Sequence, residues 1–247
     1  MVKKSQNNRI DESIIDVISV SKSFGTRPVL NGVNLKVGRA QGVCICGVNG
    51  AGKSTLLRII SGLLEPSQGS VKLCGLEVGS EPEKTKSQLG VISHKSMLYP
   101  DLSLSENLLF FAGLYSVKES RKRVKELLEE LGLASYRYDR TGILSRGMLQ
   151  RLAIARAVIH RPAVLLADEP FTGLDTEACQ HLISVLGKFR ADGGTLVMTS
   201  HDTRLGLQCC DRVMVLDKAQ IVFEAMTSEI DTDLFVQDYL AYAGNRD

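Results

Sequence analysis

The sequence has no long hydrophobic run, no surplus of one charge and no cysteine spacing typical of a structural zinc site. No stretch approaches the ~18–20 consecutive apolar residues that a membrane-spanning helix needs, and the basic first residues are not followed by the apolar core of a signal peptide. We therefore expect a chain that is not exported. Any membrane span that it works with must come from another polypeptide.

The charged residues nearly cancel, because 30 lysines and arginines stand against 28 aspartates and glutamates. Such a chain has no general field that would attract nucleic acid or an anionic membrane, so its partners must be recognised locally. Cys44 and Cys46 point to the same side of one predicted strand and are interpreted as small core residues. With six cysteines and no paired zinc spacing, the sequence favours a reducing cytosol.

Length and patterning predict one large domain. A chain of 247 residues with 44% hydrophobic composition can remove about 70–75% of its unfolded surface from water. We predict a mobile tail at residues 1–11 and a single domain at residues 12–247, with a helical subdomain at about 95–160 inserted into it. Within that subdomain the apolar residues fall on one helix face. They are Val117, Val124, Leu127, Leu128 and Leu131.

Strands and helices alternate through the rest of the chain, which predicts an α/β fold with a mostly parallel sheet. Alternating residues predict strands at Ile14–Val20 and Gly32–Val37, and a polar connection is predicted at Glu77–Ser87. The remaining predicted strands are 42–46, 70–73, 89–93, 163–167, 195–199 and 212–216, and the later helices are 147–160, 176–190 and 227–243.

A glycine loop between the strand Gly42–Cys46 and the next helix has the order of a phosphate-binding loop. Glycines let successive backbone N–H groups point inward, and the helix adds its positive end. Lys53 would reach the β- and γ-phosphates and the Ser54 hydroxyl would hold Mg²⁺, whereas the alternative is a glycine turn before an ordinary core helix. The loop residues expected to bind the polyphosphate are Gly47, Asn49, Gly50, Ala51, Gly52, Lys53, Ser54 and Thr55.

Two further predicted strands end in polar residues at the same edge of the sheet. Asp168 and Glu169 follow an apolar strand; Asp168 would orient Mg²⁺ and Glu169 would polarise the attacking water. His201 follows the strand 195–199 and could donate a hydrogen bond to a γ-phosphate oxygen. The alternatives are a solvated acidic turn and a structural histidine.

Phe24 precedes the first glycine turn, where its ring could stack on a purine. Core packing is the competing interpretation. Stacking of this kind contributes about 1–3 kcal/mol in other base-binding sites.

Together these motifs resemble the nucleotide-binding subunits of ATP-binding cassette (ABC) transporters over residues 14–225. Leu144 to Arg151 is similar to the family's signature motif, Gly173 to Asp175 to its D-loop, and His201 to its switch histidine. The resemblance implies a P-loop ATPase of the ABC type, with an antiparallel β subdomain and an inserted helical subdomain, that couples ATP hydrolysis to transport.

The resemblance also implies partners. In a head-to-tail homodimer or heterodimer of ATP-binding subunits, Ser145 and Gly147 of one subunit would complete the γ-phosphate site of the other, with Asp175 beside them. An integral membrane permease would carry the cargo. The chain would then lie in the cytoplasm on the inner face of the cell membrane. Candidate permease contacts are Met97, Leu98, Tyr99 and Phe110, although half of these could instead belong to the core of the helical subdomain.

Two positions depart from the family pattern. Arg146 and Met148 stand where glycine and glutamine are commonest in the signature, and His94 stands at the position of the Q-loop glutamine. His94 could approach Mg²⁺ or could cap an exposed strand end.

The amino-acid sequences of residues 91–108 and of the signature motif are most similar to those of heme exporter ATP-binding subunits of cytochrome c maturation. An exporter of drugs, polysaccharides or lipids would use the same chemistry. A soluble ABC ATPase acting on ribosomes or DNA is disfavoured, because the chain has one cassette, no long heptad run and no basic surplus. We therefore expect no nucleic-acid partner.

Overall fold

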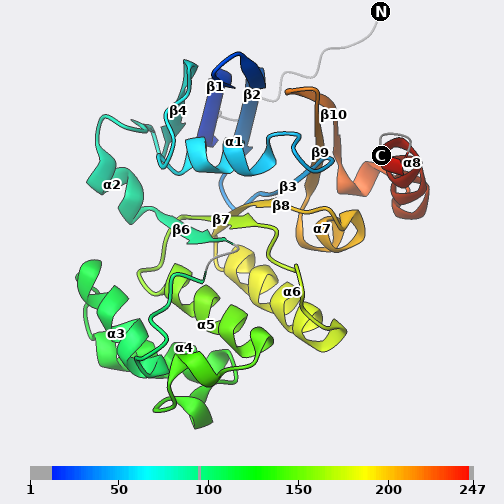
Figure 1. The fold of residues 1–247 in the computed structure, drawn as a ribbon. Coiled ribbons are helices and arrows are strands. Elements are labelled where there is room, and N and C mark those ends of the chain that lie inside the picture. The colour runs from blue at the N-terminus through cyan, green and yellow to red at the C-terminus, as the bar shows by residue number, and fades with distance from the viewer. Residues whose placement is uncertain (1–12, 94–95, 245–247) are drawn as a thin grey trace, which may run out of the picture.

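The computed structural model describes residues 13–93 and 96–244, and Figure 1 shows three layers. An antiparallel sheet lies at the top, a larger sheet crosses the middle and a helical lobe lies at the bottom. The predicted tail at residues 1–11 and His94 lie outside the described residues. Among the described residues no helix is both long enough and apolar enough to cross a bilayer.

The larger sheet has six strands in the order β10-β9-β3-β8-β7-β6. All neighbouring pairs are parallel except β10 with β9, which confirms the predicted α/β class with a mostly parallel core. The strands are β3 (Gly42–Cys46), β6 (Leu89–Ile92), β7 (Val164–Asp168), β8 (Thr195–Thr199), β9 (Arg212–Asp217) and β10 (Gln220–Met226).

The smaller sheet is antiparallel, in the order β2-β1-β4-β5. Its first two strands extend beyond the predicted ranges because they pair along a long hairpin that turns at Gly25. The strands are β1 (Ser13–Phe24), β2 (Arg27–Gly38), β4 (Gln68–Leu73) and β5 (Leu76–Glu77).

Helix α1 (Lys53–Ile60) lies between the two sheets and fixes the position of the phosphate loop. Leu56, Ile59 and Ile60 are almost completely buried in the core cluster that both sheets share. Burying each such side chain contributes about 1.5–3 kcal/mol, so the start of α1 at Lys53 has little freedom to move. Both cysteines of β3, Cys44 and Cys46, are buried as predicted.

The opposite face of the larger sheet is covered by α6 (Thr176–Ala191), α7 (Thr203–Cys209) and α8 (Thr232–Gly244). The lobe consists of α3 (Leu104–Leu114), α4 (Ser120–Glu130) and α5 (Arg146–Val158) around its own apolar cluster. Helix α5 belongs to both regions, because Leu152 and Ala155 pack in the lobe whereas Ile154 and Ala157 pack against the sheet. Movement of the lobe is therefore coupled to the core through α5.

Three elements differ from the sequence expectation. The polar connection at Glu77–Ser87 contains a short helix, α2 (Pro82–Ser87), with Thr85 as its only buried residue. Strand β10 was not predicted. It lies at the sheet edge with every side chain exposed or half-buried, so its sequence lacks the alternation of apolar and polar residues that indicates a strand. The predicted helix 227–243 begins only at Thr232, after a single 3₁₀ turn at Thr227–Glu229.

Candidate active site

The phosphate loop lies between the end of β3 and the start of α1. Gly52 has a φ of 106°, and a Cβ there would stand 2.7 Å from the Val29 carbonyl oxygen, so only glycine fits. Gly52 is also the N-cap of α1, and no side chain caps that helix end. The first amides of α1 are thus available to an anion at the positive end of the helix.

Lys53 lies inside the loop and is only 6% exposed. Its Nζ donates a hydrogen bond to the Gly47 carbonyl oxygen at 2.7 Å and lies 3.6 Å from Glu169 Oε1. A buried ammonium needs such partners, because an unpaired charge in this position would cost several kcal/mol. The loop therefore holds one positive charge directed into its own concavity.

Asp168 ends β7 with its carboxylate turned to the phosphate loop. Its Oδ1 accepts hydrogen bonds from Ser54 Oγ at 2.9 Å and from Thr199 Oγ1 at 2.7 Å. A hydroxyl and a carboxylate side by side are oxygen donors of the kind Mg²⁺ takes when phosphates and waters supply the rest of its shell. The residues present therefore fit a magnesium ion, which would neutralise charge on the phosphates.

Glu169 is the most constrained residue of the site. Its backbone has a φ of 50°, which is unfavourable for a residue with a Cβ, and its N–H donates to Thr199 Oγ1 at 3.0 Å. Its Oε2 lies 2.6 Å from His201 Nδ1 and accepts the His201 backbone N–H at 3.0 Å. With Lys53 near its other oxygen, this carboxylate has a fixed direction beside the phosphate loop.

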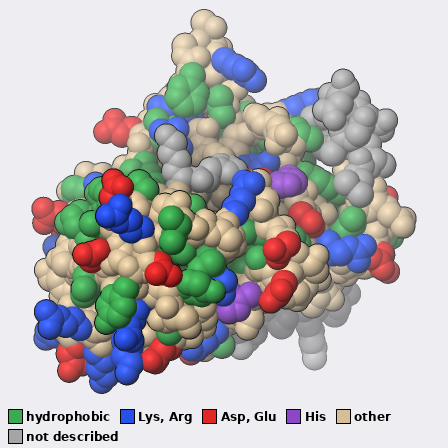
Figure 2. All heavy atoms as spheres, turned by 60° about the horizontal axis from the view of Figure 1, so that its bottom comes forward, with side chains coloured by type: hydrophobic (Ala, Val, Ile, Leu, Met, Phe, Trp, Pro, Cys, Tyr) green, Lys and Arg blue, Asp and Glu red, His purple; other side chains and the backbone are tan. Residues whose placement is uncertain are grey.

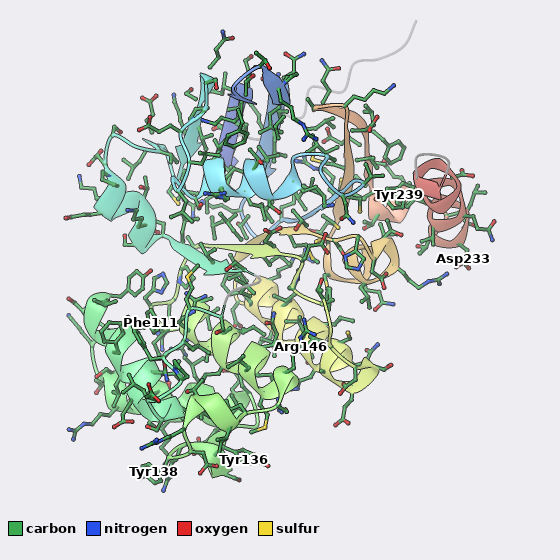
Figure 3. All side chains as sticks on the ribbon, in the orientation of Figure 1. Phe111, Tyr136, Tyr138, Arg146, Asp233 and Tyr239 are labelled. Atoms are coloured by element: carbon green, nitrogen blue, oxygen red, sulfur yellow. The ribbon has the colours of Figure 1, made fainter. Side chains whose placement is uncertain are left out.

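Tyr239 supports the phosphate loop from behind. Tyr239 lies on α8 (Figure 3). It is buried in the apolar cluster of the larger sheet and stacks on Phe235. Burial, followed by the nearby Cys46, raises the pKa of Tyr239 to about 12, while a hydrogen bond from the Gly47 backbone opposes the shift. The hydroxyl therefore stays protonated, and α8 contacts the first residue of the loop.

Phe24 lies at the tip of the β1–β2 hairpin and is 51% exposed. Lys22 Nζ lies 5.5 Å from the centroid of its ring. The ring is therefore not part of the apolar core. A planar ligand could stack on this exposed ring, and only on the face that Lys22 covers would it have to displace the lysine.

The signature residues lie at the start of α5. The Ser145 hydroxyl accepts the Met148 backbone N–H at 3.3 Å and caps the helix, and Gly147 lies in its first turn. Both residues line a cavity of about 320 Å³ together with Asp175, which caps α6 by accepting the Ala178 N–H at 2.8 Å. Within the described residues, no hydrogen bond joins Ser145 or Gly147 to the phosphate loop.

A family model described as "ABC transporter" matches residues 30–172. The chain belongs to this family of ATP-binding subunits. The resemblance seen in the sequence is thereby confirmed at the level of the family, and the chain is an ATPase cassette.

Two curated relatives are similar to the cassette over most of its length. The linearmycin resistance ATP-binding protein LnrL of Bacillus subtilis is 31% identical, over 83% of this chain and 66% of the relative. The Nod factor export ATP-binding protein I of Burkholderia lata is 35% identical, over 89% of this chain and 75% of the relative. The cassette thus spans about two thirds to three quarters of these relatives. Neither of the two bears the name of a heme exporter.

Two solved structures share the fold. A dimeric ATP-binding cassette in a post-hydrolysis state, bound to ADP and Pi, has a TM-score of 0.79 and 29% identity, covering 86% of this chain and 98% of that one. The cbiO1 protein of Clostridium perfringens, described as part of the transporter complex cbiONQ, has a TM-score of 0.81 and 25% identity, covering 95% of this chain and 96% of that one. The expected ABC-type fold, with its antiparallel and helical parts, is confirmed.

Sequence reasoning missed three contacts of the cassette's site. Thr199 joins Asp168 to Glu169 through one hydroxyl, and its position at the end of β8, two residues before His201, was the available signal. Tyr239 and Gln150 gave no such signal, because their contacts bridge elements far apart in the sequence.

Proposed function

We propose that this cassette is the ATP-hydrolysing subunit of an exporter whose membrane span is a separate permease. One observation carries the proposal: the carboxylate of Glu169 is held between Lys53 and His201 beside an uncapped phosphate loop. A carboxylate fixed next to a bound triphosphate can accept a proton from an attacking water, or can orient that water.

The roles at the nucleotide follow from these positions. Lys53 and the loop amides from Gly47 to Thr55 bind the phosphates, and Ser54 and Asp168 hold Mg²⁺. His201, in contact with Glu169, senses whether the γ-phosphate is present. Phe24, exposed at its hairpin tip, stacks on the purine. His94 stays a prediction, since it lies outside the described residues.

The proposal includes a second cassette. Ser145 and Gly147 line a cavity together with Asp175, and no residue of the phosphate loop is among its lining residues. The positive end of α5 there would attract the γ-phosphate of a second chain. The similar cassette solved as a dimer with ADP and Pi supports this arrangement. A homodimer and a heterodimer of ATP-binding subunits both satisfy it.

The surface between the lobe and the core suits a membrane partner. Met97, Tyr99 and Phe110 are exposed, and an apolar cavity of about 370 Å³ is lined by Leu63, Met97, Phe111 and Leu114 among others. On the face of the molecule turned forward in Figure 2, hydrophobic side chains lie among lysines and arginines. Unpaired apolar surface of this kind is typical of a protein contact. We place the permease here, and hence the cassette on the cytoplasmic face of the membrane.

The cargo has two candidates. The names of the two relatives favour export of compounds such as linearmycin or Nod factor. Heme export for cytochrome c maturation is supported only by the sequence similarity of residues 91–108. The first class therefore has the stronger support.

The test is capture of the ATP-loaded complex. The Glu169→Gln variant should bind ATP without hydrolysing it and should co-purify with an integral membrane protein from detergent extracts. Glu129→Gln, which changes an exposed carboxylate on α4 away from both nucleotide half-sites, is the control and should release its partner on ATP turnover. Ribosomes or DNA in place of a membrane protein would overturn the transport assignment. Stimulation of the parent complex's ATPase by heme, but not by other exporter substrates, would reverse the order of the two cargo candidates.

A further inference from the structure

Arg146, the signature residue that departs from the family pattern, covers Gly173 of the D-loop. A Cβ built on Gly173 would fall on the Arg146 guanidinium, where even the farthest of its three contacting atoms, Nη2, would be only 2.6 Å away. Figure 3 shows Arg146 at the start of α5, beside α6. Glycine is required at position 173 for two reasons. The backbone has a φ of 73°, which disfavours other residues, and Arg146 occupies the space where a Cβ would lie.

The stability of α5 does not explain this arginine. Arg146 is the first residue of the helix, where the helix dipole disfavours a positive charge. In the part of the chain that the structure describes, its guanidinium has neither an ion pair nor a hydrogen bond. The guanidinium instead lies against Gly173, where a Cβ would fall on its Cζ and both Nη atoms. A planar guanidinium fits such a close approach better than an ammonium does.

A second contact from the same helix face reaches the same segment. Gln150, one turn after Arg146, donates its Nε2–H to the Pro170 carbonyl oxygen at 2.9 Å. Residues four apart on a helix lie above one another, so the first turns of α5 touch the segment 169–175 at two points. Arg146 and Gln150 also line, with Glu169, a cavity of about 160 Å³.

The segment between Glu169 and Asp175 is a continuous series of turns. Thr172 N–H donates to the Glu169 carbonyl oxygen at 3.2 Å, and Leu174 N–H donates to the Phe171 carbonyl oxygen at 3.2 Å. Asp175 then caps α6. Gly173 lies between Thr172 and Leu174, the two donors of these bonds, so a displacement there would disturb the turn that begins at Glu169. The left-handed backbone of Glu169 depends on its surroundings.

We propose that Arg146 is a positioning residue for ATP hydrolysis: by covering Gly173, its guanidinium holds the turn that carries Glu169. The proposal rests on the ATPase activity alone, and it is independent of the cargo and of the permease. It assigns a role to a side chain where the family most often has none.

The test compares substitutions at Arg146 in the full chain. Arg146→Ala should lower kcat for ATP about five- to ten-fold and leave KM within about two-fold, because the phosphate loop is untouched. Arg146→Lys, which keeps the charge and the stem but loses the plane, should fall between Ala and the parent. Arg121→Ala removes a charge that is also exposed, on α4, and should match the parent.

A double-mutant cycle then isolates the contact. Gly173→Ala forces the guanidinium away in the parent, but in the Arg146→Ala background it adds only backbone strain. We expect its effect on kcat to be at least about three-fold smaller in that background. If the Gly173→Ala protein does not fold, the kcat values of the Arg146→Ala and Arg146→Lys variants are sufficient to test the proposal.

Three results would overturn the proposal. One is an Arg146→Ala kcat close to that of the parent. Another is equal activity of the Lys and Ala variants. The third is a Gly173→Ala substitution that lowers kcat by the same factor in the parent and in the Arg146→Ala background. An inactive parent would instead count against the proposed function, so the two failures are distinguishable.

Discussion

The two halves of the nucleotide site differ in burial and in how completely their groups are paired. On the core side, Lys53 and Glu169 are nearly buried, and each has partners within the same chain. On the lobe side, Ser145 and Arg146 are exposed, and the signature residues have no hydrogen bond to the phosphate loop among the described residues. One chain therefore builds a nearly complete phosphate site and presents separately, on the lobe, polar groups that could complete the site of a second chain.

The largest expected effect is on the core side. Glu169→Gln keeps the shape and the hydrogen bond from His201 but removes the proton acceptor. We expect ATP hydrolysis to fall at least ~100-fold with ATP binding retained. Phosphate release and nucleotide binding measure the two quantities. A variant that still hydrolyses at the parental rate would remove Glu169 from the chemistry.

A smaller effect is expected at the edge of the same half. Phe24→Ala should weaken ATP binding about 5- to 150-fold through loss of stacking on the purine. Because Phe24 is exposed, the free energy of unfolding should hardly change. Val222→Ala, an exposed apolar residue on β10, is the control for surface truncation. Unchanged nucleotide affinity in folded Phe24→Ala protein would refute the stacking role.

The smallest expected effect is on stability, through the contact of His160 with the lobe and the core. His160 follows α5, stacks on Tyr115 with ring centroids 3.8 Å apart, and bonds through Nε2 to the Leu89 carbonyl oxygen of β6 at 2.9 Å. Burial, partly opposed by that hydrogen bond, lowers the pKa of His160 below its ordinary value. The unfolded chain therefore takes up a proton at higher pH than the folded chain does.

It follows that stability is lost as the pH falls below about 6.5 towards the lower pKa of the folded state. His160→Gln keeps a donor for Leu89 without the titration, so the parent should lose more unfolding free energy between pH 7 and 5 than the variant. The excess should be under about 1 kcal/mol, because the ring is partly exposed. Denaturant unfolding at both pH values measures it. A larger loss in the variant would contradict the sign.

Sequence reasoning predicted that the residues of the core half lie together, because each of them follows directly after a strand or belongs to one loop. The phosphate loop, Asp168 and Glu169, and His201 each come directly after a strand, and parallel strands end at one edge of the sheet. Short motifs were therefore enough to bring these residues together.

The other elements and contacts could not be predicted from short sequence patterns. Strand β10 follows a turn at Lys218 and Ala219, both with positive φ and neither a glycine, so the usual hairpin signal is missing. Helix α2 has too few buried residues for an apolar period, although Pro82 at its first turn was a clue. The contact of Arg146 with Gly173 joins segments 27 residues apart and depends on how α5 packs on the core.

The measurement that tests most directly whether the site is shared mixes two inactive variants. Lys53→Ala removes the charge of the phosphate loop. Ser145→Asp keeps an N-cap for α5, because aspartate caps helices as well as serine, but places a negative charge where the γ-phosphate of a second chain would bind. Ser145→Asn is the neutral control for the change in size.

Each variant alone should be nearly inactive. In a 1:1 mixture, half of the dimers contain both variants, and each mixed dimer has one site with an intact loop and an intact signature. We predict that the mixture recovers up to about a quarter of the parental ATPase rate. A mixture no more active than the two variants measured separately would contradict a site formed by two copies of this chain.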